Sequence, residues 1–102
     1  MIHVLATVDV VEGKRETFLK EFRKVIPAVQ GEKGCIEYGP TVDLSTGIPL
    51  QVPLRENVVV IVEKWDNLEA LKAHLTAPHM KAYRAAVKDM VKGMEVQILE
   101  PA

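Results

Sequence analysis

The chain has 102 residues, of which 48% are hydrophobic, and this length and composition predict a single globular domain over residues 1–102. Its 13 basic and 14 acidic residues leave a net charge of −1, so no excess of positive charge is available to bind nucleic acid. No apolar run approaches the roughly 18 residues that span a membrane. The single cysteine, Cys35, cannot form an internal disulfide, and the first residues do not resemble a secretory signal. We therefore expect a cytosolic protein that binds neither nucleic acid nor a membrane.

Strand-like segments alternate with helix-like segments along the chain. Alternating apolar residues predict a strand over 2–11, and β-branched or apolar runs predict further strands over 35–42, 58–65 and 94–99. A stripe of apolar residues at helical spacing predicts a first helix that ends near Gln30; the stripe comprises Phe18, Leu19, Phe22, Val25, Ile26 and Val29.

Two more helices are predicted between the last two strands. Asp66 and Glu69 have the spacing of a capping box, which predicts that a short helix begins there. Pro78 is typical of a first helical turn and predicts a second helix that continues to about Gly93. The resulting order, strand, helix, strand, strand, helix pair, strand, predicts a ferredoxin-like βαββαβ α+β fold with an antiparallel sheet.

The predicted strand 58–65 is hydrophobic on both faces, with Val58, Val60 and Val62 on one side and Val59, Ile61 and Trp65 on the other. Helices cover only one face of such a sheet, so a second copy of the chain is expected to cover the other. We therefore expect a homodimer. The long irregular segment 43–57 is either a surface arm that reaches the partner or a lid over a pocket.

Two histidines near the helix break are candidate site residues. His79 lies on the same side of its predicted helix as Tyr83 and in its first turn, where the helix dipole favours a neutral imidazole that can act as a general base. The alternative is a histidine at the edge of the core whose nitrogens are satisfied by the backbone. His74 flanks the apolar stripe of the preceding helix and is either an orienting residue or a structural one.

Glu63 and Trp65 end the predicted strand 58–65 on its core side. A carboxylate there needs a partner, which His74, His79 or Arg84 could supply, either as an ion pair that ties helix to sheet or as an orienter of a histidine. Trp65 is either core or a flat wall for an aromatic substrate.

Several familiar motifs are absent. The sequence has no Gly-rich phosphate loop, no nucleophilic serine elbow and no flavin or nicotinamide fingerprint. His74 and His79 are five positions apart across a helix break, which is poor spacing for a metal site. We therefore expect no bound cofactor and no metal.

The motifs Glu63-x-Trp65, Ala-Leu-x-x-His74 and Pro-His79-x-x-x-Tyr83 resemble those of the antibiotic biosynthesis monooxygenase family. Glu32-Lys-Gly-Cys35 and the ending 97–101 are most similar to its bacterial quinol monooxygenase subgroup, and the resemblance covers essentially the whole chain. It implies a dimeric α+β barrel that oxidises a quinol or another small electron-rich aromatic substrate with O2, without flavin, haem or metal. It also implies that His79 is the base and Glu63 or His74 its orienter, with Trp65 and Tyr83 as the wall and hydrogen-bond donor.

Other relatives set the alternatives. Haem-degrading relatives need a histidine and an asparagine where this chain has Arg84 and Ala6, so haem degradation is not expected. Relatives that isomerise small phosphorylated carbonyl compounds need a cation for the phosphate, for which Arg84 and Lys81 are the candidates. A non-catalytic, dimeric ligand-binding domain of the stress-response type would use the same pocket.

Overall fold

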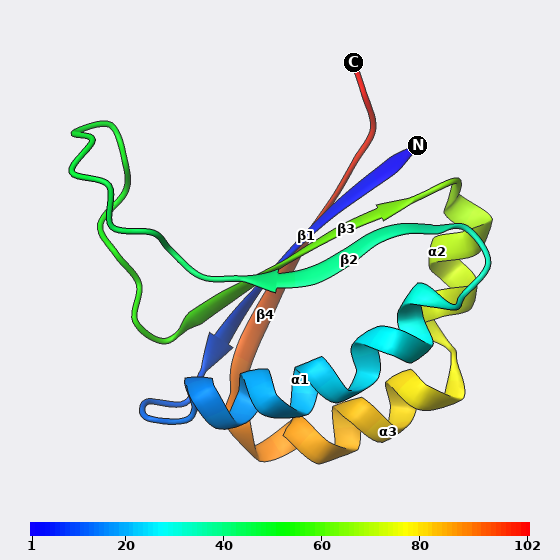
Figure 1. The fold of residues 1–102 in the computed structure, drawn as a ribbon, viewed down its shortest axis with the longest axis horizontal. Coiled ribbons are helices and arrows are strands. Elements are labelled where there is room, and N and C mark those ends of the chain that lie inside the picture. The colour runs from blue at the N-terminus through cyan, green and yellow to red at the C-terminus, as the bar shows by residue number, and fades with distance from the viewer.

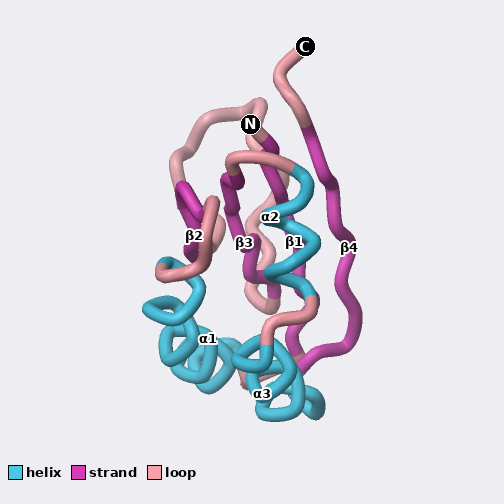
Figure 2. Tube along the Cα trace, turned by 90° about the vertical axis from the view of Figure 1, so that its right-hand side faces the viewer, coloured by secondary structure: helices cyan, strands magenta, loops and turns pink.

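The computed structural model describes residues 1–102 in the element order βαββααβ. The strands are β1 (Ile2–Val10), β2 (Cys35–Thr41), β3 (Val58–Trp65) and β4 (Val91–Leu99), and the helices are α1 (Arg15–Gln30), α2 (Leu68–Leu75) and α3 (Pro78–Val87), followed by a short 3₁₀ turn, η1 (Lys88–Met90). One antiparallel four-stranded sheet has the order β2-β3-β1-β4, which runs from left to right in Figure 2. All three helices lie on one side of it (Figure 1). The predicted ferredoxin-like α+β fold is confirmed.

The hydrophobic core lies between the sheet and the helices. Every second residue of β1 faces it, and none of these is more than 5% exposed: Val4, Ala6, Val8 and Val10. Phe22 of α1 is fully buried, and its ring stacks on Tyr38 of β2 at 5.3 Å between centroids and meets Tyr83 of α3 edge-on at 5.6 Å. Burying one such large apolar side chain stabilises the fold by about 1.5–3 kcal/mol, so these contacts fix α1 and α3 against the sheet.

The last helix is shorter than the sequence predicts. It ends at Val87, and β4 begins at Val91 rather than at residue 94. Val91 pairs with Val10 of β1, and the backbone N–H of Val11 donates to the Met90 carbonyl at 2.8 Å. Pairing with β1 satisfies backbone groups that the helix would otherwise have bonded, so the sheet overrides the helical spacing that the sequence shows at this point.

Helix α2 is capped by Asn67 and not by the predicted capping box at Asp66. The Asn67 Oδ1 atom accepts a hydrogen bond from the backbone N–H of Ala70 at 2.9 Å. The backbone N–H of Asp66 instead donates to the Gly34 carbonyl at 2.8 Å. Asp66 therefore belongs to the turn that leaves β3, one residue before the cap.

The turn between α1 and β2 lies against α2. Gly34 adopts φ +85, and a Cβ atom built at this position would lie 2.5 Å from the Ala70 Cβ. Only glycine allows both this backbone conformation and this approach. The turn is also closed internally, because the N–H of Glu32 donates to the Val29 carbonyl at 2.9 Å and the Glu32 carbonyl accepts from Cys35 at 3.2 Å. Glu32 is thereby held beside α2.

Residues 42–57 form an arm that projects away from the sheet (left in Figure 1). Its base is closed by a two-pronged ion pair in which the Asp43 carboxylate accepts from Nε and Nη2 of Arg55, each at 2.9 Å. These hydrogen bonds lower the pKa of Asp43 to about 2. The apolar side chains of the arm remain exposed, among them Leu44, Ile48, Leu50, Val52 and Leu54. None of the three helices is long and apolar enough to cross a membrane.

We expect Gly34→Ala to destabilise the protein more than Gly13→Ala does. Both glycines have positive φ, which costs another residue about 1 kcal/mol, but a Cβ at Gly13 meets nothing within 4 Å. The contact with Ala70 should add at least about 1 kcal/mol to the loss at Gly34. Urea unfolding of both variants measures the difference. Equal losses would show that the turn can move away from α2.

Candidate active site

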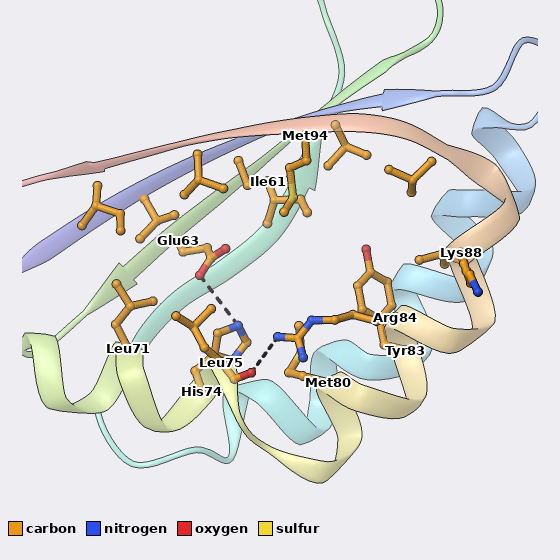
Figure 3. Close-up of a pocket in the computed structure, with 17 residues that line it drawn as sticks. Ile61, Glu63, Leu71, His74, Leu75, Met80, Tyr83, Arg84, Lys88 and Met94 are labelled. Atoms are coloured by element: carbon orange, nitrogen blue, oxygen red, sulfur yellow. Dashed lines mark hydrogen bonds and ion pairs between the residues drawn. The ribbon is translucent and has the colours of Figure 1, made fainter.

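A cavity of about 490 Å³ lies between the helix side of the sheet and helices α2 and α3 (Figure 3). Thirteen of its 17 lining residues are hydrophobic, so its walls are mainly apolar. Glu63 and His74 lie close together in it, whereas Tyr83, Arg84 and Lys88 line it from α3 and η1 (Figure 3). A cavity of this size with a few convergent polar groups is typical of a small-molecule site.

Glu63 lies on the core side of β3, as the sequence predicts. It is buried, and its Oε1 atom accepts a hydrogen bond from the Trp65 indole N–H at 2.9 Å. Burial raises the pKa of the Glu63 carboxyl, and the charge of Glu32 adds to this, whereas the Trp65 hydrogen bond and His74 act in the opposite direction. The carboxyl group is therefore more readily protonated than an exposed glutamate.

Trp65 is not a wall of the cavity. It is fully buried in the core, and it is absent from the cavity lining. Its indole packs on the His74 ring at 4.7 Å between centroids and donates to Glu63. Trp65 therefore positions Glu63 and His74 from the core side, because the end of β3 packs against α2.

His74, which the sequence places at a helix edge, is almost fully buried and lines the cavity. Its Nδ1 atom lies 2.9 Å from the Glu32 Oε2 atom, and its Nε2 atom lies 4.0 Å from the Glu63 Oε1 atom (Figure 3 shows the second contact). Rings of Trp65 and Tyr38 pack against it. The imidazole is thus fixed in orientation, with one nitrogen toward the turn and the other toward Glu63.

His79, the expected base, does not line the cavity. Its Nε2 atom lies 2.7 Å from the same Glu32 Oε2 atom, and the side chain borders a surface groove between α1 and α3. It makes no contact with Glu63, so the expected pair of His79 and Glu63 is not formed. His79 follows Pro78 at the start of α3, where its side chain meets the turn that carries Glu32 rather than the sheet.

Glu32 belongs to the motif Glu32-Lys-Gly-Cys35, but the sequence did not predict that it is part of the site. It lies in the turn between α1 and β2, and one of its carboxylate oxygens contacts both histidines. The sequence did contain a signal for this contact. It has two histidines that need hydrogen-bond partners, and it has a carboxylate between two turn glycines just after a predicted helix. What the sequence lacked was any indication that this turn touches α2.

Tyr83 and Arg84 both line the cavity, as expected of binding residues. Burial raises the pKa of the Tyr83 hydroxyl, which the nearby Arg84 charge opposes, so the phenol remains a hydrogen-bond donor. Arg84 donates from Nη2 to the Leu75 carbonyl at 2.7 Å and forms no ion pair with Glu63. Lys81, the second expected cation, is exposed and lies outside the lining, where Lys88 is found instead.

Two other expectations concern metal and the arm. No group of three or more His, Cys, Asp or Glu side chains is arranged to hold a metal ion.

No residue of the arm contributes to the cavity lining, so the arm is not a lid over the cavity of its own chain.

The model of the antibiotic biosynthesis monooxygenase family matches residues 1–86. The chain belongs to this family. The "Probable quinol monooxygenase YgiN" of Escherichia coli K12 is 39% identical over 103 residues, which cover 99% of this chain and 98% of YgiN. YcnE of Bacillus subtilis 168, named as a candidate monooxygenase, is 30% identical over 91 residues, or 89% of this chain and 86% of YcnE. A solved structure from Caulobacter crescentus, named as a candidate of the same family, matches with a TM-score of 0.82 at 28% identity and covers 99% of this chain and 89% of that one. These relatives support a monooxygenase.

We expect Glu63→Gln to change how stability depends on pH. The pKa of Glu63 in the folded protein is above its ordinary value of 4.5, so folding favours the protonated form. The wild type should therefore lose stability relative to the variant as the pH rises through 4.5 toward the raised folded value, while glutamine still accepts from Trp65. Urea unfolding at pH 4 and pH 7 measures this. Glu37→Gln, at a half-exposed surface ion pair, is the control and should show no such trend. A constant difference between wild type and Glu63→Gln would contradict the raised pKa.

Proposed function

We propose that this protein is a monooxygenase that oxidises a quinol or another electron-rich aromatic compound with O2 and needs no flavin, haem or metal. The observation that carries the proposal is the pair of Glu63 and His74 beside an otherwise apolar cavity. The quinol monooxygenase name of a relative at 39% identity supports the substrate class. An apolar cavity suits a flat aromatic ring, and the pair supplies acid–base chemistry.

The substrate itself supplies the electrons in this reaction. A base removes the phenolic proton, and the resulting anion gives one electron to O2, which yields a substrate radical and superoxide. Collapse of this pair by a second electron and proton transfer gives a quinone and hydrogen peroxide, and this branch places no oxygen atom in the substrate. Recombination instead forms a C–O bond to the ring and a hydroperoxide, whose O–O bond breaks with loss of water to leave a carbonyl. The protein has to supply the base, hydrogen-bond donors and a cavity that excludes water.

The geometry favours His74 as the base, in place of His79. The Nε2 atom of His74 faces Glu63 at the cavity, whereas His79 borders the outer groove. Glu63, whose pKa is raised by burial, can hold a proton and donate it to an oxygen of the substrate. Tyr83 is a second donor, from the wall formed by α3.

An isomerase of a phosphorylated carbonyl compound is the second candidate, because Arg84 and Lys88 both line the cavity. It would use the same base without O2. Monitoring O2 uptake with a panel of hydroquinones, under air and without it, separates the two activities. Binding of such compounds with no turnover would support a ligand-binding domain.

We also propose that the chain forms a homodimer through the sheet face that carries no helices. Leu5, Val60 and Val62 lie on this face, and no element of the same chain covers them (Figure 1). Apolar surface of this kind on a small protein usually marks an interaction site.

Sedimentation at micromolar concentration should therefore give about twice the chain mass of 11.3 kDa. Val62→Glu should shift the protein toward monomer, because a charge would be buried in the interface. Leu68→Glu, on α2 on the helix side, is the matched control and should remain a dimer. A folded wild-type monomer at that concentration would refute the proposal.

We expect His74→Gln to lower quinol-dependent O2 uptake by about 10²-fold or more, the usual contribution of a positioned base. Lys72→Gln is the control on the same helix, since Lys72 is exposed and does not line the cavity. Its turnover should match that of the wild type. Near-normal turnover in a folded His74→Gln variant would remove His74 from the mechanism.

A further inference from the structure

One carboxylate oxygen joins the two histidines of the family motif. The Glu32 Oε2 atom lies 2.9 Å from His74 Nδ1 and 2.7 Å from His79 Nε2. The Glu32 side chain is 13% exposed and that of His79 is 29% exposed, whereas that of His74 is only 2% exposed. The three residues therefore form a continuous hydrogen-bonded connection from the cavity wall to the surface groove between α1 and α3.

We infer that Glu32 is a positioning residue that holds the hydrogen of His74 on Nδ1, and that His79 in turn anchors Glu32. A carboxylate can only accept hydrogen bonds, so the ring nitrogen that faces it carries the hydrogen. In a neutral imidazole the other nitrogen, Nε2, then has the free lone pair, and this is the nitrogen that faces Glu63. The inference rests on the proposed function, in which His74 accepts the substrate proton.

The local structure suits this role better than that of an incidental surface ion pair. Glu32 is held by backbone hydrogen bonds on both sides of its turn, and Gly34 allows that turn to approach α2. A second donor, His79, prevents the carboxylate from rotating toward solvent. Glu32 does not line the cavity, so it does not touch the substrate. Its contact with the site is His74, and its charge also favours the protonated form of Glu63.

The negative charge of Glu32 also has a chemical consequence. When His74 takes a proton on Nε2, the ring becomes an imidazolium with hydrogens on both nitrogens. Glu32 then faces the Nδ1 hydrogen with its charge, while Glu63 lies near Nε2. The charge of Glu32 thus stabilises the positive ring, which is the part played by the carboxylate in serine hydrolase triads.

Glu32→Gln tests the inference, because the amide keeps the shape but removes the charge and can present either oxygen or NH2 to His74. We expect kcat for quinol oxidation to fall at least about 10-fold with KM little changed. His79→Gln should cause a smaller fall in kcat, and the double variant should be no slower than Glu32→Gln, because both act through one contact. Glu69→Gln, an exposed glutamate in the first turn of α2, is the control and should match the wild type.

Side-chain ¹⁵N NMR of the histidines supplies a measurement that does not need substrate. At a pH where His74 is neutral, it should carry its hydrogen on Nδ1 in the wild type and lose this preference in Glu32→Gln. If Glu32 only stabilised the fold, kcat would be unchanged in folded Glu32→Gln or His79→Gln, and that result would overturn the inference. A wild-type His74 that carries its hydrogen on Nε2 would also overturn it. A wild type with the expected tautomer but no O2 uptake would instead refute the proposed function.

Discussion

The Glu63 carboxyl group lies on the core side of β3, in register with Val4 of β1 and Tyr38 of β2. A carboxyl group in that position loses its hydration and needs hydrogen-bond partners from the protein. Trp65 supplies an N–H from the same strand, and His74 approaches from α2. The buried His74 in turn needs a partner for its other nitrogen, and Glu32 provides it. No buried side-chain nitrogen or oxygen is left without a partner. The need of the buried Glu63 carboxyl for partners thus leads through His74 to Glu32 near the surface.

This network gives the cavity two chemically different parts. Most of its lining is apolar, which lowers the local dielectric constant and strengthens the charge interactions beside it. The acid–base groups are concentrated at Glu63 and His74, and Tyr83 adds a neutral phenol whose pKa burial keeps high. A reaction in which the substrate supplies the electrons needs little more from a protein than proton transfer and a dry cavity. The family supports a monooxygenase, and the acid–base pair beside an apolar cavity is compatible with the reaction that we propose.

The edges of the sheet remain open in the single chain. Met94, Val96 and Ile98 of β4 face the helix side but are 48–60% exposed, because the helices do not reach this strand. The arm likewise presents Leu50 to solvent at 96% exposure. Together with the helix-free face, these surfaces are the physical reason for proposing a second copy of the chain.

The sequence alone determined the fold, the bounds of β3, the inward position of Glu63 and the family, because strand and helix periodicities are local and the motif residues are close in the chain. Only the tertiary structure decided the end of α3, where pairing with Val10 turned Val91 into a strand residue. It also placed His74 at the cavity and His79 at the outer groove. Glu32 lies 42 residues from His74 and 47 from His79 along the chain. Their contact depends on how closely the turn at Gly34 packs on Ala70 of α2. Side-chain volumes between separate elements set this distance, and the spacing of residues along the sequence does not reveal it.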